Sequence, residues 1–103
     1  MKTLHLVLKS KWYDKIASGE KTSEYRECKP YWNKRLVGTP YVPCLGNKEQ
    51  NETLYCLYDH VCFHRGYTSE TMLFPIRALY ITTKANDLNL DKCWEIKLGK
   101  RIK

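Results

Sequence analysis

The stretch that decides the fold is "LHLVLKSKWYDKIASGEKTSEYRE", residues 4–27. Leucine at every second position of Leu4–Leu8 predicts a strand with one apolar face. Ser10 can cap a short helix over Lys11–Ser18, in which a tryptophan and an isoleucine four residues apart lie on one face. Gly19 suits the left-handed backbone that ends many helices. A strand, a short helix and a glycine stop therefore open the chain.

The block that follows, Glu20–Glu27, carries charges of both signs, and its residues 21–27 predict a second strand. If the strand begins near Thr22, then Thr22, Glu24 and Arg26 face the same way, because side chains alternate along a strand. Glu24 and Arg26 are then about 7 Å apart along that face, close enough for their long side chains to pair. Lys21 lies beside them, where it can bind a phosphate or, if desolvated, act as a base. The alternative is an ordinary surface salt bridge at a hairpin edge.

The rest of the chain predicts one more helix and three more strands. Pro30 suits the first turn of a helix that Gly38 ends, and Pro75 lies inside a long β-rich run, which indicates an edge position or a bulge. The predicted segments are a helix over 30–36, an exposed loop over 39–53, a strand over 54–64, a strand over 72–83, a polar turn over 86–91 and a strand over 93–99.

Five strands with two short helices early in the chain are typical of neither a βαβ repeat nor a helix bundle. We therefore expect a single domain over residues 1–103 of mixed α/β, mostly β class. The expected architecture is a small antiparallel or mixed β-barrel of about five strands, with the two helices flanking a cleft.

The net charge of +7 comes from 18 basic and 11 acidic residues and is uneven. Residues 1–35 hold nine basic and four acidic side chains, residues 36–96 hold five and seven, and residues 97–103 add four basic ones. Basic ends suit a polyanion such as RNA, DNA or a nucleotide phosphate; the alternative is a solvated basic face. Five cysteines without a CxxC pair favour a reducing compartment. Without a long apolar run or a signal-peptide pattern, we expect a soluble cytoplasmic protein with no membrane partner.

Two further groups of residues suggest chemistry. His60, Cys62 and His64 share one strand face, but the two histidines are about 13 Å apart in an extended strand, too far to bind one ion. We therefore predict no metal and no other cofactor, with two of the three plus a distant cysteine as the alternative. The second group suits stacking on a base or pairing with a phosphate, the alternatives being core packing or a solvated turn. Its members are Lys11, Trp12, Trp32, Arg35, Arg65 and Tyr67.

Three blocks together resemble the ASCH domain family of the PUA-like superfamily over nearly the whole chain: "LVLKSKWYDKIASGEKTSEYRECKPYWNKRL", "YDHVCFHRGY" and "WEIKLGK". The most specific parts are "GEKTSEYR", which is similar to the family's G-x-K-x-x-x-x-R pattern, and the "FHRGY" turn. The resemblance implies a PUA-like β-barrel with a cleft between barrel and helices, and an RNA or nucleoside ligand.

Some bacterial members of this family are small amidohydrolases that remove the acetyl group from acetylcytidine, and others are linked to RNA cleavage or to binding without turnover. The amidohydrolases use a lysine in this block, a threonine three residues later as nucleophile, and a glutamate on a distant segment. Lys21 matches the lysine, whereas the threonine position falls on Glu24. Thr22 and Ser23 supply hydroxyls nearby, although a shift of one residue turns a strand side chain to the other face. Glu70 is the candidate for the distant glutamate.

Three function hypotheses follow. In the first, Lys21, Glu24 and Arg26, with the aromatic and basic group around them, bind an RNA segment, a nucleoside or a nucleotide. In the second, the protein is a hydrolase of an acylated nucleoside or of RNA, with Lys21 as base or electrostatic stabiliser and Glu24 activating water or orienting Lys21. The third is a protein-interaction domain that uses the 39–53 loop or the basic 97–103 tail. We expect a monomer or a weak dimer.

Overall fold

The computed structural model describes residues 2–39 and 56–103, and seven helices and strands follow one another in them. They are β1 (Thr3–Leu8), α1 (Ser10–Ala17), β2 (Ser23–Glu27), α2 (Pro30–Val37), β3 (His60–Arg65), β4 (Thr71–Thr82) and β5 (Cys93–Leu98). Residues 40–53 of the predicted loop, and the first two residues of the strand predicted over 54–64, lie outside the described residues. Within the described ranges, no helix has the length and apolar character needed to cross a membrane.

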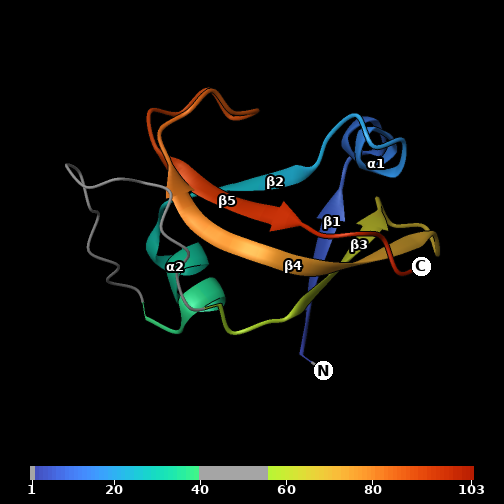
Figure 1. Cartoon of the computed structure of the whole chain (residues 1–103), viewed down its shortest axis with the longest axis horizontal. Helices are drawn as coiled ribbons and strands as arrows, with labels where there is room; N and C mark the ends of the chain where they lie inside the picture. The colour runs from blue at the N-terminus through green and yellow to red at the C-terminus, as the bar shows by residue number, and fades with distance from the viewer. Residues whose placement is uncertain (1, 40–55) are drawn as a thin grey trace.

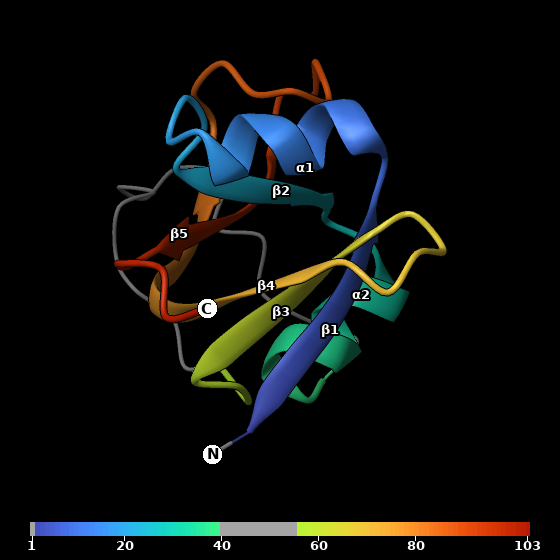
Figure 2. The same cartoon turned by 90° about the vertical axis from the view of Figure 1, so that its right-hand side faces the viewer.

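The five strands form one curled sheet in the order β1-β3-β4-β5-β2 (Figures 1 and 2). β1 runs parallel to β3, whereas β3–β4, β4–β5 and β5–β2 are antiparallel pairs. The mixed, mostly β class with five strands and two short helices is thereby confirmed. In the part of the chain that the structure describes, β1 and β2 are the outer strands and no ladder joins them. The described sheet is therefore half a barrel, open on one side, which confirms the predicted barrel in part.

β4 is the central strand, and its bend curls the sheet. Residues 71–75 pair with β3, and residues 76–82 pair with β5. The register towards β5 shifts between Ile76 and Ala78, directly after Pro75. An irregularity of this kind bends a strand and increases its twist, which explains how one strand of 12 residues serves two partners in turn. The prediction for Pro75, an edge position or a bulge, is therefore confirmed by the bulge, which lies in the central strand of the sheet.

Both helices end where glycine was expected. Gly19 follows α1 with φ of 84°, and Gly38 ends α2 with φ of 91°. Side chains with a Cβ atom rarely adopt this conformation, so the sequence marks these ends clearly. The start of α1 differs from the prediction: Lys9 occupies the capping position and Ser10 is already helical, so the predicted Ser10 cap is wrong.

The core lies inside the curl of the sheet. Trp94 on β5 is fully buried there, and its indole N–H donates a 2.9 Å hydrogen bond to Oδ1 of Asn33 on α2. A buried indole N–H needs such an acceptor, so this bond fixes α2 against β5. The apolar core consists of Leu4, Leu6, Leu8, Tyr13, Ile16, Leu36, Val61, Phe63, Met72, Phe74, Leu79, Ile81, Trp94, Ile96 and Leu98.

Replacing Asn33 with alanine leaves the buried Trp94 indole N–H without this acceptor. We expect Asn33→Ala to lower the free energy of unfolding by about 1–3 kcal/mol, measured by chemical denaturation. Lys34→Ala is the matched control, because Lys34 is the next residue of α2 and its side chain is exposed. The control should change the free energy of unfolding by less than about 0.5 kcal/mol.

The same substitution in a Trp94→Phe background isolates the hydrogen bond. There the indole donor is already gone, so Asn33→Ala should cost less than it does in the wild-type chain. An equal cost in the two backgrounds would contradict the importance assigned to this bond.

Candidate functional site

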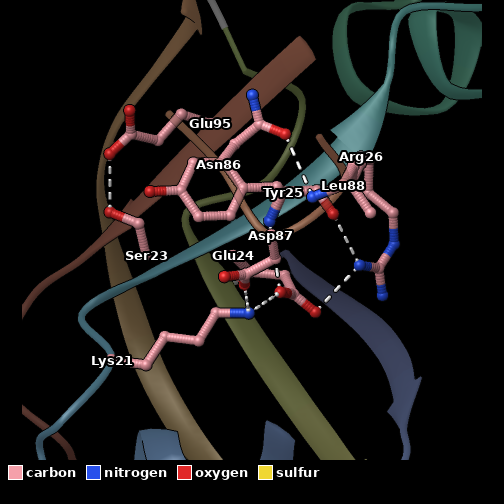
Figure 3. Close-up of polar contacts among 9 residues, drawn as sticks. All are labelled: Lys21, Ser23, Glu24, Tyr25, Arg26, Asn86, Asp87, Leu88 and Glu95. Atoms are coloured by element: carbon pink, nitrogen blue, oxygen red, sulfur yellow. Dashed lines mark hydrogen bonds and ion pairs between the residues drawn. The ribbon is translucent and has the colours of Figure 1, made fainter. Parts of the chain in front are cut away.

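Glu24 on β2 is the centre of a cluster of charged side chains (Figure 3). Its side chain is only 4% exposed, and each carboxylate oxygen accepts a hydrogen bond from a cation. Oε1 accepts from Nζ of Lys21 at 2.7 Å, and Oε2 accepts from Nη1 of Arg26 at 2.8 Å. The backbone N–H of Tyr25 also donates to Oε1, at 3.1 Å. The predicted pairing of Glu24 and Arg26 on one strand face is confirmed, and Lys21 joins the pair.

Asp87, in the turn between β4 and β5, supplies a second carboxylate to the Lys21 ammonium (Figure 3). Asn86 shapes this turn, because its side-chain oxygen accepts the backbone N–H groups of Leu88 and Leu90 at 3.0 and 3.3 Å. Asp87 is not among the residues that the sequence predicts for the site. A polar turn carries no local signal of which strand it approaches, and the approach follows only from β5 lying between β4 and β2.

Two aromatic rings flank the Lys21 ammonium. Nζ lies 4.7 Å from the centre of the Trp12 ring and 5.6 Å from that of Tyr25. Lys11 and Lys15 also approach Trp12, at 4.6 and 5.4 Å. Three cations around one indole ring form cation–π contacts and make its surroundings positive.

The Glu24 cluster and the rings of Trp12 and Tyr25 line a cleft with a volume of about 220 Å³. Of the predicted site residues, Trp12, Lys21, Glu24 and Arg26 form part of its wall, together with Asp87 from the turn. Pockets for drug-sized ligands hold about 300–1,000 Å³. The cleft is smaller, so it suits a single ring system or a small polar group better than an extended ligand.

A second pair of polar side chains, one on β2 and one on β5, lies on the face of the sheet opposite to Glu24. Ser23 is buried, and its Oγ donates a 2.8 Å hydrogen bond to Oε2 of Glu95 on β5 (Figure 3). Both residues line a neighbouring hollow of about 370 Å³, whose wall also includes Lys21 and Asp87. Lys21 therefore contributes to both hollows. A glutamate from a distant segment does lie near the Lys21 block, but it is Glu95.

Among the described residues, Trp32 on α2 contacts the charged cluster through Arg26, and Arg35 in turn contacts Trp32. The Arg26 guanidinium lies 5.2 Å from the centre of the Trp32 ring, and the Arg35 guanidinium lies 5.3 Å from it. Arg35 also donates a 2.8 Å hydrogen bond to the backbone oxygen of His5. Arg35 thereby ties α2 to β1, and the Trp32 ring makes a cation–π contact with Arg26.

Arg65, Tyr67 and Glu70 are not brought to either of these hollows. Arg65 donates two hydrogen bonds of 3.2 Å to the Asp14 carboxylate, which tie the end of β3 to α1 and lower the pKa of Asp14. Tyr67 is completely exposed in the turn after β3. The backbone oxygen of Glu70 accepts a hydrogen bond from the backbone N–H of Arg65, in the same turn.

The Tyr25 phenol predicts a measurable dependence on pH. Burial, followed by the nearby carboxylates of Glu95 and Asp87, raises the pKa of Tyr25 from 10.0 to about 12. A raised pKa means that folding favours the neutral phenol. Its contribution to stability is therefore complete below pH 10.0 and is lost as the pH rises through about 12.

Phenolate absorbance followed against pH checks this expectation. Tyr25→Phe should remove a titration step near pH 12 and flatten the loss of stability above pH 10.0. Tyr31→Phe is the control, because it removes a phenol that is exposed on α2 and should leave the step near pH 12 in place. If Tyr25→Phe instead removes a phenolate step near the ordinary tyrosine pKa of about 10, the Tyr25 phenol is solvated and its burial is contradicted.

Comparison of the chain with family models, curated proteins and solved structures finds no match in any of the three. The family resemblance therefore rests on the quoted sequence blocks. The candidate site rests on the distances and burial described above.

Proposed function

We propose that the chain is a PUA-like, ASCH-type domain that binds a nucleoside or nucleotide unit of RNA in the cleft around Lys21. The observation that carries the proposal is the Glu24 carboxylate. It is buried, it holds two cations, and it lies in the wall of a cleft beside an indole ring. The resemblance of the "GEKTSEYR" block to the ASCH family supports the same conclusion.

Stability alone does not account for this cluster. Replacing a buried ion pair with well-packed apolar side chains is often neutral or stabilising, because the desolvation of both charges is avoided. Glu24 and its two cations therefore have a further use, and charged groups of this kind are concentrated in binding and catalytic clefts.

The cleft offers a base both a stacking surface and polar partners. The Trp12 ring can stack on one face of a base, as aromatic side chains do in RNA-binding proteins. An ammonium has three N–H donors; among the described residues Glu24 and Asp87 accept from Lys21, which leaves one donor for a carbonyl or phosphate oxygen of the ligand. Asp87, whose side chain is 29% exposed, can accept from an exocyclic amino group or a ribose hydroxyl.

The rim of the cleft adds attraction for the backbone. Lys9 lines the cleft, and Lys11 and Lys15 follow on α1 around the Trp12 ring. These ammonium groups can neutralise phosphates on either side of the bound unit, which raises affinity without selecting a sequence. The cleft's small volume limits the specific contacts to about one base, so selectivity comes from the Glu24 cluster and Asp87.

Binding of a short single-stranded RNA, followed by fluorescence anisotropy, tests this proposal. Lys21→Ala and Arg26→Ala should each weaken binding by about 1–3 kcal/mol, roughly five- to 150-fold, since each removes a group of the cleft. Lys34→Ala removes the same charge from the exposed side of α2 and should change the affinity little. A cooperative melting curve for each variant verifies that it is folded.

Equal weakening by all three substitutions would show that net charge alone attracts RNA. The same would follow from equal affinity for RNA and heparin with a steep salt dependence. Unchanged binding in Lys21→Ala and Arg26→Ala would remove the cleft from recognition altogether.

A second candidate function, hydrolysis of an acylated nucleoside or of RNA, is favoured by the hydrogen bond from Ser23 to Glu95. A hydroxyl beside a carboxylate base is the arrangement of an activated nucleophile, and the nearby Lys21 ammonium can stabilise developing negative charge. Both oxygens of Glu24 are bonded to cations, so in this scheme Glu24 positions Lys21 and does not activate water.

Turnover measured by mass spectrometry, on acetylcytidine, other acylated nucleosides and short RNAs, tests the second candidate. If the protein is a hydrolase, Ser23→Ala and Lys21→Ala should abolish turnover. Thr22→Ala should preserve it, because Thr22 is exposed on the neighbouring position. Turnover that survives Ser23→Ala would exclude this hydroxyl as the nucleophile, and binding without turnover would leave the first proposal standing alone.

A further inference from the structure

A cluster with different chemistry lies on the outer face of the sheet, where β1 and β3 run side by side (Figure 2). In their parallel register His5 is opposite Cys62, and Val7 is opposite His64. Their neighbours Leu4 and Leu6 on β1, and Val61 and Phe63 on β3, are buried in the core. His5, Cys62 and His64 therefore point outwards together and form the His–Cys–His cluster.

The ligand atoms of this cluster are close together. Nδ1 of His5 lies 3.0 Å from Nε2 of His64, and the two rings are tilted by 46°. One ring nitrogen of each histidine and the Sγ of Cys62 all lie within 4.8 Å of one another. Around a tetrahedral ion with bonds of about 2.0–2.3 Å, ligand atoms are about 3.3–3.7 Å apart. Small side-chain rotations therefore suffice to place all three around one ion.

The donor set selects the class of ion. Two imidazole nitrogens and a thiolate are ligands of zinc and other borderline or soft metals, whereas calcium and magnesium require oxygen ligands. His5 is exposed and the other two residues are half-buried, so an ion can enter from solvent. Three protein ligands leave a fourth tetrahedral position for water or another ligand.

We propose that His5, Cys62 and His64 bind a zinc ion on the outer face of the sheet, with one coordination position open. Residue spacing within β3 alone predicts no metal, because it takes no account of a ligand from a neighbouring strand. His60 does lie too far along β3, and its Nδ1 contacts Oδ1 of Asp59 at 2.7 Å. The third ligand comes from the neighbouring strand β1. The proposal is independent of the nucleoside-binding proposal.

Zinc titration of the whole chain under reducing conditions, in competition with a chelating dye, tests the site. The wild-type chain should bind one equivalent. His5→Ala, His64→Ala and Cys62→Ser should each lower the zinc affinity at least about 100-fold, because loss of merely a hydrogen-bond partner of a metal ligand typically costs about 10- to 100-fold. His60→Ala, on the same strand face, and Cys28→Ser are the matched controls and should leave the affinity unchanged.

Cobalt substitution identifies the sulfur ligand. Cobalt bound to the wild-type chain should show a thiolate charge-transfer absorption that is absent from Cys62→Ser and present in Cys28→Ser. Failure of the wild-type chain to bind zinc would overturn the proposal. It would also be overturned by unchanged affinity in any of the three cluster variants, or by an equal loss in His60→Ala.

Discussion

The carboxylate of Glu24 is the constraint on which the candidate site depends. A carboxylate that is 4% exposed is costly unless its charge is paired and its oxygens are hydrogen-bonded. Lys21 and Arg26 meet both requirements, at 2.7 and 2.8 Å. Because removal of either cation leaves the buried charge only partly compensated, the three side chains act as one unit. Two aromatic rings contact this unit: Trp12 lies beside Lys21, and Trp32 lies beside Arg26.

The curled sheet brings the parts of this site together. The register shift after Pro75 lets β4 pair first with β3 and then with β5, and β5 pairs in turn with β2. The turn between β4 and β5 brings Asp87 against Lys21. The parallel register of β1 and β3 brings together the His–Cys–His cluster on the outer face. One small sheet thus carries a cleft with paired charges and a separate group of nitrogen and sulfur ligands.

Local patterns predicted the local features and little else. Alternating leucines and two glycines located β1 and the ends of both helices, and the spacing of Glu24 and Arg26 predicted their pairing. The approach of Asp87 to the cluster, and of His5 to the ligands on β3, depends on strand order and register, which no short pattern encodes. Arg65 resembles a ligand-binding arginine by residue type, yet its guanidinium is engaged by a carboxylate of α1. Residue type alone does not separate these two uses of arginine.

The most direct test of the account is a nucleoside titration of isotope-labelled protein, followed through the indole N–H signals of its three tryptophans. We expect a large shift of the Trp12 signal, a smaller one for Trp32, which contacts Arg26, and none for the buried Trp94. An unmoved Trp12 signal, with shifts confined to the turn that holds Arg65 and Tyr67, would place the ligand elsewhere and contradict the central claim that the Glu24 cluster forms the binding site.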